Sequence, residues 1–125
     1  MIIGIGVDIA KVSRFEKVLE RHGERFVERI LHPNEQNRYQ THGQPLSFFA
    51  KRYAAKEALS KALGTGIAKG VNFNEIEVRQ DENGRPFLVL HESTLEVANK
   101  LGVKNLFLSL SDEQEYAIAN VVLEG

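Results

Sequence analysis

The sequence predicts an α+β fold in which an antiparallel sheet packs against helices, one of them long and central. The apolar run from Ile2 to Val7 is rich in β-branched residues and predicts a buried strand. The alanine-rich run from Ser47 to Leu63 predicts the long helix. Two pairs of short apolar segments in the second half of the chain predict hairpins, and hairpins produce antiparallel sheets.

Helices are predicted between the first strand and the long helix. Apolar residues at helical spacing indicate a helix from Val12 to Gly23 and a shorter one over Glu24 to Leu31. His32-Pro33-Asn34 breaks the pattern, and Glu35 to Thr41 adds one or two further turns. We expect Ser47 to cap the long helix.

Turn residues separate the predicted elements in the rest of the chain. Gly64 is expected to end the long helix. Strands over Asn74 to Arg79 and Pro86 to Leu90 enclose Asp81-Glu82-Asn83-Gly84, where Asn83-Gly84 suits a type I′ turn. A helix over Ser93 to Leu101 follows. Two last strands, Leu106 to Leu110 and Tyr116 to Leu123, complete a single domain over residues 1–125.

Composition narrows the class of protein. The chain has 125 residues, 42% of them hydrophobic and 26% charged, which is ordinary for a soluble domain. A net charge of -1 disfavours a nucleic-acid binder. The absence of cysteine excludes disulfides, thiolate metal sites and a cysteine nucleophile. No apolar stretch approaches the roughly 20 residues of a membrane span, so we expect a cytoplasmic protein without a membrane partner.

Asp8 is the first candidate functional residue, because it ends the apolar strand. A carboxylate there is costly to bury unless it meets a cation or hydrogen-bond donors. It could cap the following helix or bind a metal ion, and the sequence alone favours neither.

Glu57 is the second candidate. It could form a surface ion pair with Lys61, four residues later. However, it is the one acidic residue among the cations of this helix, and Gly64-Thr65-Gly66 follows as a loop that a ligand can approach closely. Two carboxylates from separate elements, with nearby cations for phosphate, suggest Mg²⁺ and a phosphate-bearing ligand. No Walker-type loop is present.

Other candidates are weaker. The four histidines show no metal-ligand spacing and are expected at the surface. Arg14, Arg21 and Arg25 recur at near-helical spacing, either as a solvated face balanced by glutamates or as a docking surface for an acidic partner.

Two motifs resemble those of the holo-[acyl-carrier-protein] synthases, the small 4′-phosphopantetheinyl transferases. The first is Gly4 to Ile9, and the second runs from Phe49 to Ala58 and continues through Lys61 to Ile67. The resemblance extends through Asn83-Gly84-Arg85-Pro86 and the last two strands, so it covers essentially the whole chain.

The resemblance implies transfer of 4′-phosphopantetheine from coenzyme A to a serine of apo-acyl carrier protein, in fatty acid biosynthesis. Asp8 and Glu57 would bind Mg²⁺. The coenzyme A site would include phosphate contacts and residues near adenosine: Lys61, Arg52, Gly64, Thr65, Gly66, Asn83, Gly84 and Pro86. Arg14, Arg21 and Arg25 would dock the carrier protein. The resemblance also implies a homotrimer, whose active sites would lie between neighbouring subunits.

Two points stay open at this stage. Some family members have a histidine where this chain has Asp112. Asp112 could act as a base, could add a carboxylate near the metal, or could have no catalytic role. The serine proton could pass to a metal-associated water or to Glu57. A non-catalytic oligomeric module that binds an anionic metabolite is the alternative function.

Overall fold

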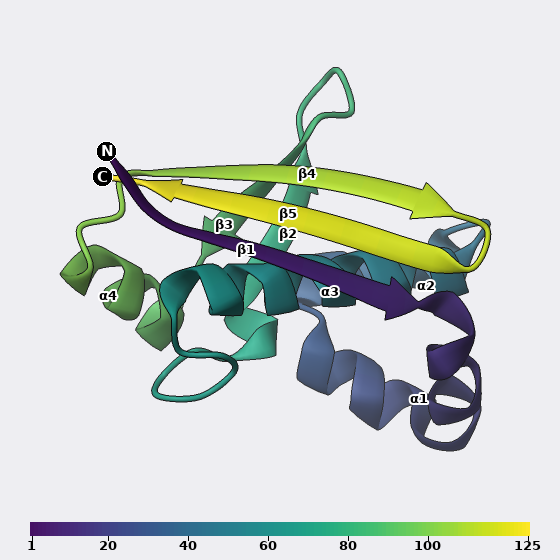
Figure 1. Ribbon diagram of the computed structural model, residues 1–125. Helices are drawn as coiled ribbons and strands as arrows, with labels where there is room; N and C mark the ends of the chain where they lie inside the picture. The colour runs from purple at the N-terminus through teal and green to yellow at the C-terminus, as the bar shows by residue number, and fades with distance from the viewer.

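A three-stranded antiparallel sheet covered on one face by a long helix forms the centre of the molecule (Figure 1). The computed structural model describes all 125 residues. The sheet has the order β1-β5-β4, so β1 and β4 are its edges. These strands are β1 (Ile2–Lys11), β4 (Asn105–Glu113) and β5 (Tyr116–Glu124), and the helix is α3 (Pro45–Leu63). The α+β prediction with one long central helix is therefore confirmed.

The other elements surround α3. A 3₁₀ turn, η1 (Val12–Phe15), leads into α1 (Glu16–Ile30), and α2 (Pro33–Thr41) precedes α3. A second 3₁₀ turn, η2 (Phe73–Glu75), leads into the antiparallel hairpin. Its strands are β2 (Ile76–Gln80) and β3 (Pro86–Leu90), and α4 (Glu92–Lys100) follows them. No helix is both long and apolar enough to cross a membrane.

The contact between β1 and α3 is exceptionally close. A Cβ atom added at Gly6 would lie 2.0 Å from the carbonyl oxygen of Ala58, and one at Gly4 would lie 2.1 Å from that of Ala62. Both distances are far below contact, so only glycine allows the strand to lie this near the helix. Small side chains on α3 complete the fit, because Ala58 is fully buried and Ala62 nearly so.

The two faces of the sheet differ in burial. On the face that meets α3, alternate residues of β5 are fully buried: Ala117, Ala119, Val121 and Leu123. The opposite face has no covering element in one chain and carries large apolar side chains. Among them are Ile5 (69% exposed), Ile9 (60%), Val7 (58%), Phe107 (47%) and Ile118 (38%). Such a contiguous apolar surface marks an interaction site.

Three predicted boundaries were wrong. The first strand continues to Lys11, so Asp8 lies within β1 and does not cap a helix. The two early helices form one element, α1, interrupted only at His22, whose backbone is non-helical. The helix α3 begins at Pro45 because proline suits a first helical turn, and this places Ser47 inside the helix.

Turn geometry gave one success and one error. Gly64 ends α3 in the left-handed conformation with φ of 81°, as predicted. The type I′ turn at Asn83-Gly84 is wrong, since that turn needs positive φ at both central residues and Asn83 does not have it. Instead, the Asp81 carboxylate accepts hydrogen bonds from the backbone N–H groups of Asn83 (2.8 Å) and Arg85 (2.9 Å). This side chain organises a longer loop.

The close β1–α3 contact predicts a large effect of adding one methyl group. Gly6→Ala should lower the free energy of unfolding by more than about 3 kcal/mol, because neither backbone can move without losing the core. Urea unfolding measures this. The matched control is Gly23→Ala, where a Cβ meets nothing within 4 Å. The control should be neutral or stabilising by about 0.5–1 kcal/mol. Equal stability of Gly6→Ala and the wild type would refute the close-contact argument.

Candidate functional site

Asp8 lies on the face of β1 that meets α3. Its partner across the sheet is Ala119, and its side chain is 15% exposed. The Lys61 ammonium donates to the Asp8 carboxylate at 3.0 Å and to the carbonyl oxygen of Val7 at 3.1 Å. The expected i, i+4 partner of Lys61 was Glu57, but its ion pair is with Asp8. The strand and the helix thus bring the predicted carboxylate and cation together.

Glu57 is half-buried on the same side of α3. Burial raises the pKa of Glu57, and the negative charge of Asp8 raises it further, whereas Lys61 and Arg14 oppose the shift. The two carboxylates therefore lie close enough to repel each other. A cation between them would relieve this repulsion, and carboxylate oxygens are the ligands that Mg²⁺ prefers. The residues present fit a hard divalent cation.

The glycine loop follows at the same end of α3. Gly66 has a positive φ of 64°, and a Cβ added at Gly64 or Gly66 would meet nothing within 4 Å. The backbone here is accessible to a ligand. The Thr65 hydroxyl donates to the carbonyl oxygen of Gly66 at 2.7 Å, which fixes the shape of the loop. We call Asp8, Glu57, Lys61 and residues 64–66 the β1-side group.

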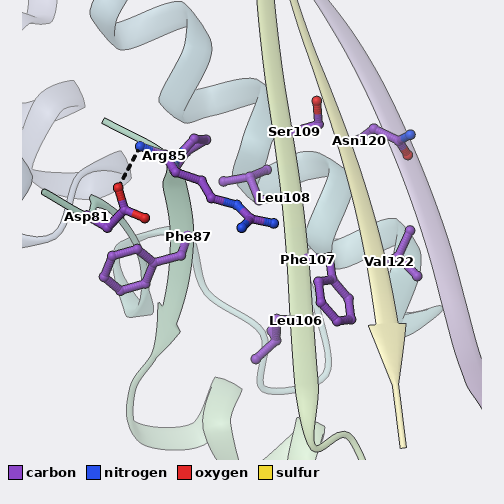
Figure 2. Close-up of a pocket in the computed structure, with 10 residues that line it drawn as sticks. Asp81, Arg85, Phe87, Leu106, Phe107, Leu108, Ser109, Asn120 and Val122 are labelled. Atoms are coloured by element: carbon purple, nitrogen blue, oxygen red, sulfur yellow. Dashed lines mark hydrogen bonds between the residues drawn. The ribbon is translucent and has the colours of Figure 1, made fainter. Parts of the chain in front are cut away.

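The other predicted coenzyme A residues lie on the far side of the sheet. A cavity of about 580 Å³ lies between the β2–β3 hairpin and the β4 edge, and Figure 2 shows the residues that line it. Pro86 lines it with Arg85 and Phe107, and Asn83 and Gly84 belong to the adjacent loop. Because β5 lies between β1 and β4, this cavity and Asp8 are on opposite edges of one sheet.

Asp112 also lies on the β4 side. It is near the end of β4 and about half exposed. Its carboxylate is 4.0 Å from the Lys51 ammonium and accepts from the Ser47 hydroxyl at 3.4 Å. A single chain does not bring Asp112 to Glu57.

Arg52 faces α2 and the hairpin. Its side chain is 3% exposed, with Nε 3.9 Å from the Glu35 carboxylate and the guanidinium 4.1 Å from the Phe48 ring centroid. Burial lowers the pKa of Arg52 to about 10. Two of its nitrogens, Nε and Nη2, are buried without any hydrogen-bond partner. Unpaired buried donors are unusual, and a bound anion would satisfy them. We call the hairpin loop and Asp112 the β4-side group; Arg52 lies apart from them, beside Glu35 and Phe48.

The three docking candidates are all exposed. Arg14 belongs to η1, whereas Arg21 and Arg25 belong to α1 on either side of its break. Arg14 is near the β1-side group, because its charge lowers the pKa of Glu57.

Sequence reasoning missed a buried ionic network. Lys56 is one of several cations on α3, and it is fully buried. Its ammonium donates to the Glu35 carboxylate at 2.6 Å, to the Phe73 carbonyl oxygen at 3.0 Å and to the Ile76 carbonyl oxygen. The flanking apolar residues Ala54, Ala55, Ala58 and Leu59 were the available signal. Lys56 is therefore structural and joins α3 to α2 and β2.

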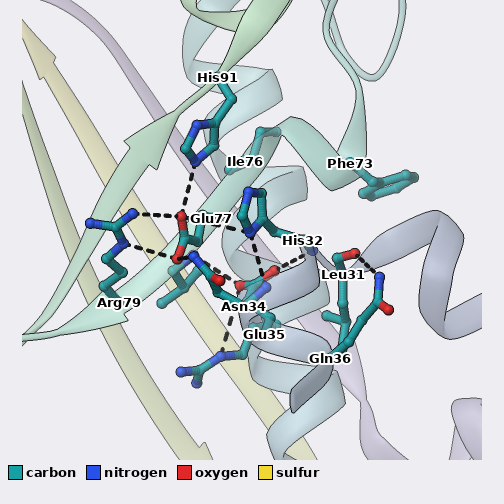
Figure 3. A network of polar contacts seen from close by, with 12 residues as sticks. Leu31, His32, Asn34, Glu35, Gln36, Phe73, Ile76, Glu77, Arg79 and His91 are labelled. Atoms are coloured by element: carbon teal, nitrogen blue, oxygen red, sulfur yellow. Dashed lines mark hydrogen bonds and ion pairs between the residues drawn. The ribbon is translucent and has the colours of Figure 1, made fainter. Parts of the chain in front are cut away.

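A second missed cluster contains two of the histidines. His32 and His91, expected at the surface, are partly buried and stacked, with ring centroids 4.5 Å apart at 20° (Figure 3). With Glu77 they place three ligand atoms within 4.8 Å of one another. A metal ion should lie in the plane of each imidazole that binds it, and two stacked rings do not permit this for one ion.

Glu77 is instead satisfied by hydrogen bonds. Burial alone would raise the pKa of Glu77, but donors from Arg79, His91 and Asn34 outweigh it and lower the pKa to about 2. Both Arg79 contacts are short, at 2.9 and 3.1 Å. The cluster joins α2 to the hairpin by hydrogen bonds and does not fit a metal centre.

Glu77 predicts a pH-dependent contribution to stability. Its pKa in the folded protein, about 2, is below the ordinary value of 4.5, so its contribution is complete above pH 4.5 and is lost as the pH falls toward 2. Glu77→Gln should lower the free energy of unfolding by roughly 3 kcal/mol at pH 7. The difference from wild type should shrink in urea unfolding at pH 3.5. The control is Glu96→Gln on the exposed surface of α4. If the difference in free energy of unfolding between Glu77→Gln and the wild type did not change with pH, the account would be contradicted.

Comparisons with known proteins identify the family of this chain. The model of the 4'-phosphopantetheinyl transferase superfamily matches residues 4–121. The holo-[acyl-carrier-protein] synthase of Yersinia enterocolitica is 52% identical over 124 residues, which are 99% of this chain and 98% of that protein.

Solved structures show the same fold over the whole chain. The holo-[acyl-carrier-protein] synthase from Neisseria meningitidis has a TM-score of 0.95 at 38% identity, with both chains fully covered. A holo-(acyl-carrier-protein) synthase from Bacillus anthracis, in complex with CoA (3',5'-ADP), has a TM-score of 0.83 at 43% identity and covers 100% of this chain and 98% of that one. This chain belongs to the 4'-phosphopantetheinyl transferase superfamily.

Proposed function

We propose that this protein transfers 4′-phosphopantetheine from coenzyme A to a serine hydroxyl of apo-acyl carrier protein, releasing adenosine 3′,5′-bisphosphate. The observation that carries the proposal is the pair of carboxylates, Asp8 and Glu57, beside Lys61 at an accessible loop. The family supports it, as do full-length relatives named holo-[acyl-carrier-protein] synthase. Such a reaction supplies carrier protein for fatty acid biosynthesis, and we place it in the cytoplasm.

Asp8 and Glu57 would hold Mg²⁺. When bound, the ion neutralises charge on the pyrophosphate of coenzyme A. Lys61 would add a second positive charge beside the ion. Its ammonium has three N–H donors, and two of them already donate to Asp8 and to the carbonyl oxygen of Val7. The third can donate to a phosphate oxygen, since the Lys61 side chain is 51% exposed.

The residues of the chain also account for the proton of the attacking serine. Either a metal-associated water or Glu57 would accept this proton. Asp112 is a second candidate, and only the Asp112 of a neighbouring subunit could reach a site built on Asp8.

A homotrimer would complete the coenzyme A site. The β1-side and β4-side groups lie on opposite edges of one sheet, and the sheet face between them is apolar and uncovered. If copies associate through this face, the β1 edge of one meets the β4 edge of the next. Adenosine would then contact the loop at Asn83, Gly84 and Pro86, and the unpaired donors of Arg52 would meet a phosphate of coenzyme A.

The carrier protein would dock on the exposed arginines Arg14, Arg21 and Arg25. Arginine pairs well with carboxylates and steers association with an acidic partner. Arg14 is near Glu57, so a carrier held there would present its serine to the β1-side group.

The proposal predicts a defined covalent product. With coenzyme A and Mg²⁺, the protein should add one phosphopantetheine to apo-acyl carrier protein, measured as a mass increase of the carrier. Asp8→Ala and Glu57→Ala should each reduce the rate at least about 100-fold, because each removes a metal ligand. Glu28→Ala, an exposed residue of α1, is the control. Binding of coenzyme A without any gain of carrier mass would support a non-catalytic module instead.

A further inference from the structure

The loop after α3 covers residues 64–72, and different helices hold its two ends. At the first end, the Ser60 carbonyl oxygen of α3 accepts hydrogen bonds from the backbone N–H groups of Thr65 (3.3 Å) and Gly66 (3.1 Å). The second end contacts α4. Because the first three residues of this loop belong to the β1-side group, the contacts that fix the loop also fix part of the candidate site.

Two adjacent residues of α4 bind the second end of the loop. The Ser93 hydroxyl donates to the Gly70 carbonyl oxygen at 2.7 Å. The Thr94 hydroxyl accepts from the Asn72 backbone N–H at 3.0 Å. The Thr94 side chain is fully buried, so water does not compete for its hydroxyl. Both bonds go to the loop backbone, and they hold it on either side of Val71.

One carboxylate oxygen, Oε1 of Glu75, joins these groups. It accepts from the Thr94 hydroxyl at 2.8 Å, from the Thr94 backbone N–H at 3.1 Å and from the Asn72 side-chain amide at 3.2 Å. The Ser93 hydroxyl lies 3.0 Å from the same oxygen. The first N–H groups of a helix have no partner within the helix. Glu75 supplies one from η2 and thereby orients the two hydroxyls that bind the loop.

The backbone on both sides of this contact is strained. Only two non-glycine residues of the chain have a positive φ, Lys69 at 55° and Glu92 at 51°. They directly precede Gly70 and Ser93, the two residues that the 2.7 Å hydrogen bond joins. Such a conformation persists only where the surrounding contacts over-determine it, and it is found preferentially at ligand-binding segments. The bonds to α4 therefore hold the loop in a shape that its own backbone does not favour.

We propose that Glu75, Ser93 and Thr94 are positioning residues that anchor the 64–72 loop to α4 and so set the affinity for coenzyme A. The inference rests on the proposed function, in which coenzyme A binds beside this loop. The three residues act through the loop backbone. Without the anchor, binding of coenzyme A must also order the loop, and this weakens the binding.

Thr94→Val tests the proposal, because it keeps the shape of the side chain and removes the hydroxyl. Titration calorimetry with coenzyme A and Mg²⁺, without carrier, should show binding about tenfold weaker than in the wild type. The KM for coenzyme A should rise by a similar factor, whereas kcat and the KM for apo-carrier should not change. The matched control is Thr41→Val, since Thr41 is exposed and its hydroxyl contacts only carbonyl oxygens of its own helix. The control should bind coenzyme A as the wild type does.

Ser93→Ala is a second variant, because Ser93 is only partly buried and its replacement should not prevent folding. It should also weaken binding of coenzyme A. Unchanged affinity for coenzyme A in both variants, even with a lower free energy of unfolding, would overturn the proposal, since the network would then be structural only. An equal rise in the KM values for coenzyme A and for carrier would overturn it as well. The calorimetry needs no turnover, so failure of the wild type to load carrier would refute the proposed reaction separately.

Discussion

The close approach of β1 to α3 is the constraint on which the rest of the structure depends. Two glycines of the strand lie against the backbone of the helix at distances that no side chain allows. This brings Asp8 beside Lys61 and near Glu57, although the strand and the helix are about 50 residues apart in sequence. The contact that packs the core is therefore also the contact that assembles the candidate metal site.

The same architecture divides the candidate site. A narrow sheet with β5 at its centre places the β1-side group on one edge and the β4-side group on the other. The buried network around Lys56 and Glu35 holds α3, α2 and the hairpin together and so fixes both groups relative to the sheet. The uncovered apolar face and the unpaired donors of Arg52 are each unfavourable in an isolated chain. In the proposed trimer, association of copies would cover the apolar face, and a bound anion would satisfy the donors of Arg52.

Local signals in the sequence predicted most elements, and long-range contacts explain the errors. Gly64 was predictable because the left-handed conformation that ends a helix depends on the local backbone and not on distant residues. The turn at Asn83 was not, since the Asp81 side chain replaced the expected geometry. Asp8 and Glu57 were found by residue type, but their proximity follows from tertiary packing. Burial of Lys56 and stacking of His32 on His91 depend on elements distant in the chain. The apolar residues that flank Lys56 were the local signal of its burial, and the stacking had no such signal.

The central claim is that one active site takes residues from two copies of the chain. Its most direct test mixes two variants, Glu57→Ala and Arg52→Met, after separate purification and subunit exchange. Each alone should be inactive in loading carrier, and the mixture should recover about a quarter of wild-type activity, as random assembly of two half-sites requires. Arg52→Met keeps apolar contact with Phe48 and so should fold. A mixture that stays inactive, or an active Arg52→Met enzyme, would contradict the shared site.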